Sequence, residues 1–126
     1  MLTHITIGFD NVDDARAFYD YVLEPLGLAR LMDHGTTSAY GPEGGQPQFM
    51  VLKPLNGEAA TSGNGSTIGL VAPNRSAVNE FHKRALERGG KDEGAPGLRP
   101  WAPTAYGAYI RDVGGHKICA FSMTAE

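Results

Sequence analysis

The 126-residue sequence lacks the features that mark several other classes of protein. Cys119 is its only cysteine, so no intrachain disulfide can form, as is typical of a reducing compartment. No apolar run approaches the ~20 residues that cross a bilayer. The first residues, Met1-Leu2-Thr3-His4, show no basic region followed by an apolar stretch, so no signal peptide is expected. We therefore expect a cytoplasmic protein with no membrane partner.

Concentrated positive charge is also missing. The formal net charge is −3 at pH 7, and no cluster of Lys or Arg offers a surface for nucleic acid. The sequence contains no glycine-rich phosphate loop, no nucleotide fingerprint and no Ser-His-Asp order. We therefore expect no nucleic-acid partner; the expected partner is a small-molecule ligand.

Hydrophobic periodicity predicts the same order of elements twice. Residues 2–9 alternate as a strand, and apolar residues at three- and four-residue spacing over 12–22 mark one face of a helix. Strands are expected at 28–33, 36–40 and 48–53, followed by a linker at 54–65. The second half has a strand at 67–71, a helix from Asn74 to Gly89-Gly90, a strand pattern at 91–95, a Pro-rich loop at 96–104, and strands at 105–111 and 117–123.

An internal repeat supports this division. At an offset of 63, residues 4–27 and 67–90 share six identities in 24 positions, where ordinary residue frequencies would give about one or two. Nearer the ends the offset becomes 70, which aligns the Gly44-Gly45 turn with Gly114-Gly115 and Phe49 with Cys119. The seven additional residues are expected in the loop around Arg99 and Trp101. Two unrelated strand–helix units could share this spacing by accident, but the shared helix ends favour duplication.

Several motifs, taken in order, resemble the vicinal oxygen chelate superfamily of glyoxalases, bleomycin resistance proteins and dioxygenases. The segments that carry the resemblance are 4–8, 17–19, 40–44, 65–70, 78–82 and 106–118, and the stretch 94–100 is similar to a subgroup of small glyoxalase-like bacterial proteins. The resemblance implies an α+β fold in one domain, residues 1–126. Two tandem β-α-β-β-β modules, at about 1–57 and 64–126, would form a curled, cupped mixed sheet. It also implies a homodimer.

The resemblance further implies where a metal would bind in metal-using members, on the first and last strands of each module. By the alignment these positions hold His4, Phe49, Thr67 and Cys119, of which only His4 is a family-like ligand. Hard divalent ions prefer carboxylate and imidazole ligands, and two protein ligands rarely hold zinc. A slip of one residue would exchange Phe49 for Gln48, still a weak ligand. We therefore expect no metal and no cofactor; a divalent metal held by other ligands is the alternative.

Eight residues are candidates to line a ligand pocket: His4, Gln48, Phe49, Thr67, Arg99, Trp101, Tyr106 and Cys119. An Arg beside an aromatic residue in an inserted loop suits an anionic or planar ligand; the alternative is a loop anchored by its Trp, with Arg99 in water. Cys119 is expected to be buried and inert. His116 is expected in an exposed turn, and Tyr106 and Tyr109 could lie on either side of their sheet.

Three functions remain open from the sequence. The first is a small-molecule pocket protein of the glyoxalase-like group, acting either as an enzyme without a metal or as a binding protein. The second is a metal-dependent lyase or ring-cleaving dioxygenase whose ligands the alignment misses. The third is a non-catalytic binding protein similar to drug-sequestering resistance proteins. The fold alone does not decide between them, because sites and not folds carry function.

Overall fold

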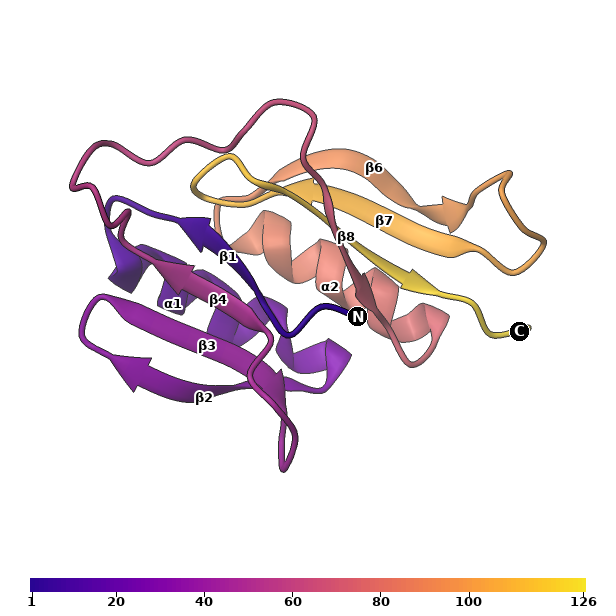
Figure 1. Ribbon diagram of the computed structural model, residues 1–126. Coiled ribbons are helices and arrows are strands. Elements are labelled where there is room, and N and C mark those ends of the chain that lie inside the picture. The colour runs from indigo at the N-terminus through magenta and orange to yellow at the C-terminus, as the bar shows by residue number, and fades with distance from the viewer.

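The computed structural model describes residues 1–126 and contains two βαβββ modules (Figure 1). The first consists of β1 (Ile5–Gly8), α1 (Val12–Val22), the 3-10 helix η1 (Glu24–Leu26), β2 (Leu28–His34), β3 (Thr37–Pro42) and β4 (Phe49–Leu52). The second consists of β5 (Ile68–Val71), α2 (Arg75–Glu87), β6 (Lys91–Leu98), β7 (Tyr106–Arg111) and β8 (Lys117–Ser122). The repeated order of elements confirms the predicted duplication. Neither helix is long and apolar enough to span a membrane.

Both helices begin at asparagines that the repeat makes equivalent. The side-chain oxygen of Asn11 accepts a hydrogen bond from the Asp13 amide at 2.9 Å, and that of Asn74 accepts one from the Ala77 amide at 2.8 Å. Each such cap stabilises a helix by about 1 kcal/mol. The apolar face predicted over 12–22 is confirmed, since α1 buries Val12, Ala15, Phe18, Tyr19 and Val22. Helix α2 buries a similar face, made of Ala77, Val78, Phe81, His82 and Ala85.

The strands form two four-stranded mixed sheets, in the orders β1-β4-β3-β2 and β5-β8-β7-β6. In each sheet the first strand runs parallel to the last strand of its module, and the other pairs are antiparallel. No backbone pairing joins β1 to β5. The single curled sheet expected from the resemblance is therefore not found as one hydrogen-bonded unit, because the modules are joined through their core and not through strand pairing.

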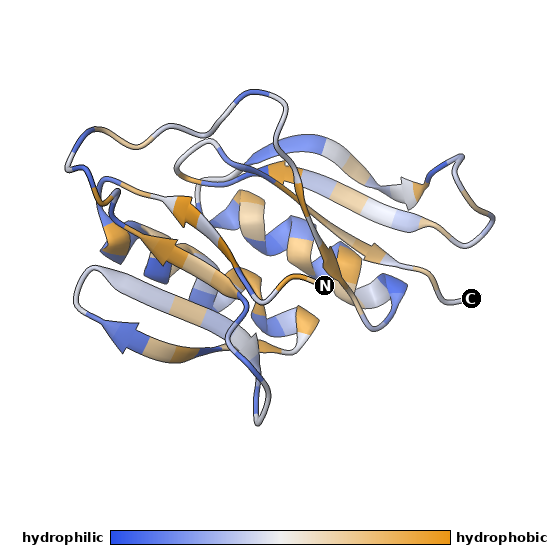
Figure 2. Cartoon of the chain, viewed as in Figure 1, coloured by the Kyte–Doolittle hydropathy of each residue, from blue (hydrophilic) through white to orange (hydrophobic).

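One hydrophobic core serves both modules. It comprises 21 buried residues drawn from both halves of the chain and lies between the helices and the sheets. Figure 2 shows the corresponding hydrophobic segments on β1, β4, β5 and β8, whereas the linker before β5 is largely hydrophilic. Helix α1 also contacts α2 directly. The modules consequently cannot bury their apolar surface independently of each other.

A buried polar link crosses the same junction. The Tyr19 hydroxyl on α1 donates to Asp112 Oδ2 at 2.5 Å, and Asp112 Oδ1 accepts from the amides of Gly114 and His116 at 2.9 Å each. In return, the His116 ring nitrogen lies 2.7 Å from the carbonyl oxygen of Gly8 on β1. The expectation that His116 is exposed was therefore wrong: it is buried, because its turn packs against the first module.

The structure places the inserted loop slightly later than the sequence pattern suggests. Strand β6 continues to Leu98, with register shifts on either side of Gly94, so the connection to β7 spans residues 99–105. The prediction of a strand ending at Ala95 was too short, because alternation is obscured where a strand bulges. The following pairing register places Ile110 opposite Ile118, as Tyr40 lies opposite Phe49. The offset of 70 thus holds for β3 and β7.

Replacing Tyr19 with Phe should destabilise the protein by about 1–3 kcal/mol, because a buried carboxylate loses one of its donors. Urea unfolding of both proteins would measure the difference. Tyr21→Phe is the matched control, since the Tyr21 hydroxyl donates to Glu87 at the surface, and we expect little change there. Equal losses in the two variants would show that the Tyr19–Asp112 link contributes nothing specific.

Candidate functional site

Each sheet has one side against the helices and an open face turned away from them (Figure 1). Strand β8 shows the division clearly. Ile118 and Ala120 belong to the core. Because side chains alternate along a strand, Lys117, Cys119 and Phe121 lie on the open face of the second module. The open face of the second module therefore carries an amine, a thiol and an aromatic ring from this one strand.

The inserted loop folds back over this open face and fixes Arg99 there. The guanidinium donates to the carbonyl oxygens of Gly97 and Ala95, at 2.9 Å each. Its Cζ lies 5.7 Å from the centroid of the Tyr109 ring. The two hydrogen bonds and the ring contact hold Arg99 against the sheet, so it is not a freely solvated loop residue.

Trp101 from the same loop completes an aromatic platform, which we define as Trp101, Phe121 and Tyr109. The Trp101 and Phe121 rings are 4.5 Å apart with a tilt of 35°, and the Tyr109 and Phe121 rings meet edge to face at 5.7 Å. A Cβ at Gly107 would lie 2.3 Å from the Phe121 ring, so only glycine there lets Phe121 rest on β7. Trp101 remains 62% exposed. The platform therefore presents a large aromatic surface to solvent.

Positive charge predominates around the platform. Lys117 Nζ lies 5.2 Å from the Tyr109 ring centroid. Arg111 is paired with Glu93 at 2.5 Å, and this contact, with a smaller effect of Lys117, lowers the pKa of the Glu93 carboxyl. Arg99 and Lys117 form no ion pair. Arg99, Lys117 and Arg111 thus lie on this face, and of the three only Arg111 is paired with a carboxylate, that of Glu93.

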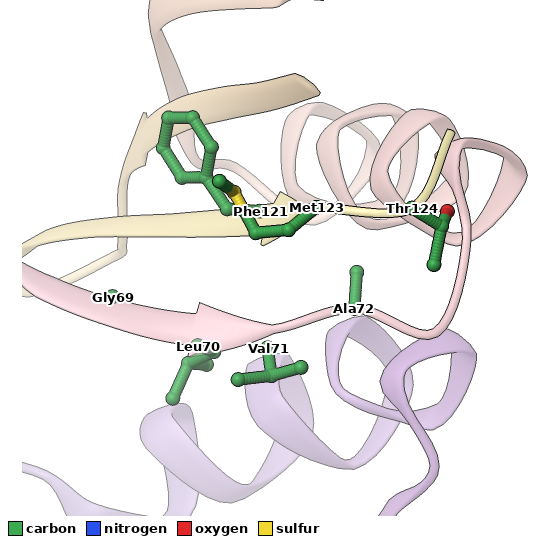
Figure 3. A pocket seen from close by; sticks show the side chains of 7 residues that line it. All are labelled: Gly69, Leu70, Val71, Ala72, Phe121, Met123 and Thr124. Carbon is green, nitrogen blue, oxygen red and sulfur yellow. The ribbon is translucent and has the colours of Figure 1, made fainter. Parts of the chain in front are cut away.

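An apolar groove of about 430 Å³ continues from the platform to the edge strand β5. It is lined by Gly69, Leu70, Val71, Ala72, Phe121, Met123 and Thr124. Figure 3 shows Phe121 and Met123 extending from β8 and its continuation, with Gly69 to Ala72 on the neighbouring strand. The groove lengthens the apolar surface that a ligand on Phe121 would contact.

A second group of sequence-predicted residues lies elsewhere, around a cleft of about 510 Å³ between β1 and β5. His4, Gln48 and Thr67 line it and are exposed. Phe49 borders the cleft but is only 3% exposed and packs on Tyr19 in the core. The eight candidates therefore do not form one pocket.

Tyr106 and Tyr109 fall on opposite sides of their sheet. The Tyr106 hydroxyl donates to Asn79 on α2 at 2.6 Å, and the Arg75 guanidinium lies 5.1 Å from the Tyr106 ring. Tyr106 therefore lies on the helix side, away from the open face. Tyr109, which the sequence left undecided, belongs to the platform. The apolar residues on either side of it, Ala108 and Ile110, were the signal that could have shown this.

Strand register alters the alignment of the last strands. Phe49 pairs with Ile5, and Ile118 pairs with Ile68. Because Ile5 and Ile68 are equivalent in the repeat, the counterpart of Phe49 is Ile118 and not Cys119. The predicted offset of 70 was wrong by one residue for β4 and β8, since the turn before β8 is one residue shorter than the turn before β4.

The side chains of one copy of the chain do not fit a hard divalent ion. No group of three or more His, Cys, Asp and Glu side chains comes together anywhere in residues 1–126. His4 Nδ1 lies 2.9 Å from the hydroxyl of Thr3 beside it, and Thr67 and Gln48 offer only neutral oxygens. Such ions require several oxygen or imidazole donors with compensating charge.

Cys119 is a buried thiol beside the platform. It is 6% exposed, and burial raises its pKa to about 11, although Lys117 acts in the opposite direction. A thiol with that pKa is protonated at neutral pH and is a poor nucleophile, because the thiolate is the reactive form.

Modification of Cys119 by a disulfide reagent at pH 8 should therefore be slow. Raising a thiol pKa by two units lowers its thiolate fraction roughly a hundredfold, and burial restricts access further. The rate in the folded protein should increase steadily up to about pH 11. The same chain in denaturant serves as the control. Equal rates in the two states at pH 8 would show that the thiol is activated or exposed.

Comparison with known proteins is consistent across the chain. The Glyoxalase/Bleomycin resistance protein/Dioxygenase superfamily profile matches residues 1–120. A glyoxalase/bleomycin resistance protein from Albidiferax ferrireducens is 33% identical, with 97% of this chain and 98% of that chain covered and a TM-score of 0.86. A glyoxalase-related enzyme from Fulvimarina pelagi is 17% identical, with 97% and 87% covered and a TM-score of 0.75. No curated protein matches. The chain belongs to the glyoxalase/bleomycin resistance protein/dioxygenase superfamily.

Proposed function

We propose that residues 1–126 act as one domain that binds a small organic molecule on the open face of the second module, without a metal ion. The observation that carries this proposal is the position of the 99–105 loop. It anchors Arg99 over Tyr109 and brings Trp101 onto Phe121, on a face with an adjoining apolar groove. Concave apolar surface with a few oriented polar groups is the usual composition of a small-molecule site.

Binding without chemistry is the function that the site supports best. Nucleophilic catalysis would need an activated thiol, and the pKa of Cys119 is raised. General acid–base catalysis would need a free carboxylate or imidazole, and Glu93, the carboxylate that pairs on this face, is held by Arg111. A lyase or dioxygenase that uses a metal would need ligands beyond those that one copy brings together. Two more distant neighbours, from Fulvimarina pelagi and Burkholderia phytofirmans, are enzymes by description, but at 17% and 14% identity their similarity supports the fold alone.

Treatment with EDTA should leave the melting temperature and ligand affinity unchanged, because no ligand set in the chain suits a hard divalent ion. Thermal melts before and after dialysis, with Mn²⁺, Fe²⁺ and Zn²⁺ added back separately, would measure this. His4→Ala should be equally neutral. A large fall in melting temperature that one ion restores, and that His4→Ala abolishes, would instead support the metal-dependent alternative.

We also propose a homodimer in the cytoplasm. The edge strands β1 and β5 border the cleft between the modules and have no strand paired along their free sides, and unpaired edges invite pairing or cover. Apolar side chains lie beside them: Val71 is 84% exposed and Leu2 is 73% exposed. A second copy covering this edge would remove that apolar surface from water.

Light scattering at micromolar concentration should therefore give the mass of two chains. Val71→Lys should shift the protein toward the monomer, because the charge would be buried in the interface. Leu55→Lys is a suitable control, since Leu55 is an isolated, fully exposed residue of the linker. A wild-type protein that is only monomeric would contradict the proposal.

A further inference from the structure

The open face of the second module has two features that a ligand could use: hydrogen-bond donors of Arg99 that no protein atom accepts from, and exposed aromatic surface. Two of the five N–H donors of Arg99 are used by Gly97 and Ala95, and the others have no protein partner. Arg99 Nε has no partner at all and is accessible to solvent, because the only buried side-chain polar atom without a partner is Arg75 Nε. Arg99 thus presents an unused donor to solvent while carbonyl groups of the backbone hold its other two nitrogens.

The second feature is the exposed outer surface of the aromatic platform. The indole of Trp101 packs one side on Phe121 and remains mostly exposed. Trp101 lies in a loop and does not contribute to the hydrophobic core. A large aromatic side chain that leaves most of its surface in water has a stronger explanation in ligand contact than in loop anchoring.

We propose that the platform selects planar aromatic monoanions, namely aryl carboxylates, and this inference rests on the proposed function. The aryl ring would stack on Trp101 and Phe121. The carboxylate would accept two hydrogen bonds from the unused donors of Arg99, because a guanidinium matches a carboxylate in geometry and charge. Lys117, whose Nζ lies 5.2 Å from the centroid of the same Tyr109 ring, adds long-range attraction.

The charges on this face favour an anion over a neutral ligand, and the geometry of Arg99 favours a carboxylate among anions. Arg111 is already neutralised by Glu93 at 2.5 Å, which leaves Arg99 and Lys117 as the cations available to a ligand. Glu93 also lies close enough to Lys117 to interact with it. A dianion such as a phosphate monoester would be attracted by both cations, but it would also be repelled by Glu93, and its third terminal oxygen would find no donor on the single tethered guanidinium. We therefore expect the carboxylate to bind more tightly.

Calorimetric titration with four probes tests the inference. The probes are 2-naphthoate, the neutral 2-naphthalenemethanol, the non-aromatic cyclohexanecarboxylate and the dianionic 2-naphthyl phosphate. We expect 2-naphthoate to bind at least tenfold more tightly than each of the others, with an affinity that falls as salt is added. Trp101 is the only tryptophan, so its single indole N–H resonance in a ¹⁵N-labelled sample reports whether the probe occupies this face.

Variants separate the contributions of charge and stacking. Arg99→Gln and Lys117→Gln should each weaken 2-naphthoate and leave 2-naphthalenemethanol unchanged. Lys117→Gln keeps the test valid if Arg99→Gln disturbs the loop, because the Lys117 side chain forms no hydrogen bond or ion pair and its loss leaves the loop contacts in place. Trp101→Leu should weaken all three naphthyl probes and spare cyclohexanecarboxylate. The matched control is Arg88→Gln, whose guanidinium lies 4.1 Å from the Tyr21 ring in the helix layer.

The outcomes distinguish this inference from the function on which it rests. 2-Naphthalenemethanol could bind as tightly as 2-naphthoate, shift the indole resonance and keep the same affinity for Arg99→Gln and Lys117→Gln. In that case the open face binds ligands, but the choice of an anionic ligand is wrong. Tighter binding of 2-naphthyl phosphate would likewise overturn the choice of a carboxylate. If no probe shifts the indole resonance at millimolar concentration, the proposed function fails together with the inference.

Discussion

The buried contact between Tyr19 and Asp112 holds together the arrangement on which the open face depends. An ionised carboxylate in a protein interior costs several kcal/mol unless hydrogen bonds replace its water. Asp112 has three such donors, the Tyr19 hydroxyl and two amides of its own turn. Burial raises the pKa of both side chains, although the hydrogen bond from Tyr19 opposes this at Asp112. The turn between β7 and β8 is consequently fixed against helix α1 of the other module.

That turn determines where β8 lies, and β8 is an inner strand that pairs with both β5 and β7. Its alternate residues supply the core on one side and Lys117, Cys119 and Phe121 on the other. Gly107 then sets how closely Phe121 approaches β7, since any larger residue would meet its ring. The platform is therefore built from the same strand positions that the inter-module link fixes, and only Arg99 and Trp101 come from the loop.

The elements could be predicted from the sequence because they rest on local signals. The first helix followed from apolar spacing and the second from its bounds at Asn74 and Gly89-Gly90, and the seven-residue insertion followed from the repeat offset. Other features depend on pairing across the sheet, which periodicity does not contain. The burial of His116, the separation of Tyr106 from Tyr109 and the one-residue shift at Cys119 all required the strand register. The turn between β7 and β8 is one residue shorter than the turn between β3 and β4, so Cys119 is not the counterpart of Phe49. No local sequence pattern indicates the length of that turn.

The strands separate the residues that the fold needs from those that border the cleft. His4, Gln48 and Thr67 are exposed at the cleft and contribute nothing to the core. Ile5 and Ile68, by contrast, pack against the core, and their strand partners Phe49 and Ile118 are buried within it. Substitution on the open side of β1 and β5 therefore costs the fold little, whereas substitution on the helix side would open cavities. The open faces can therefore change in sequence with little loss of folding free energy. On the open face of the second module, the 99–105 loop supplies two side chains, the anchored Arg99 and the aromatic Trp101.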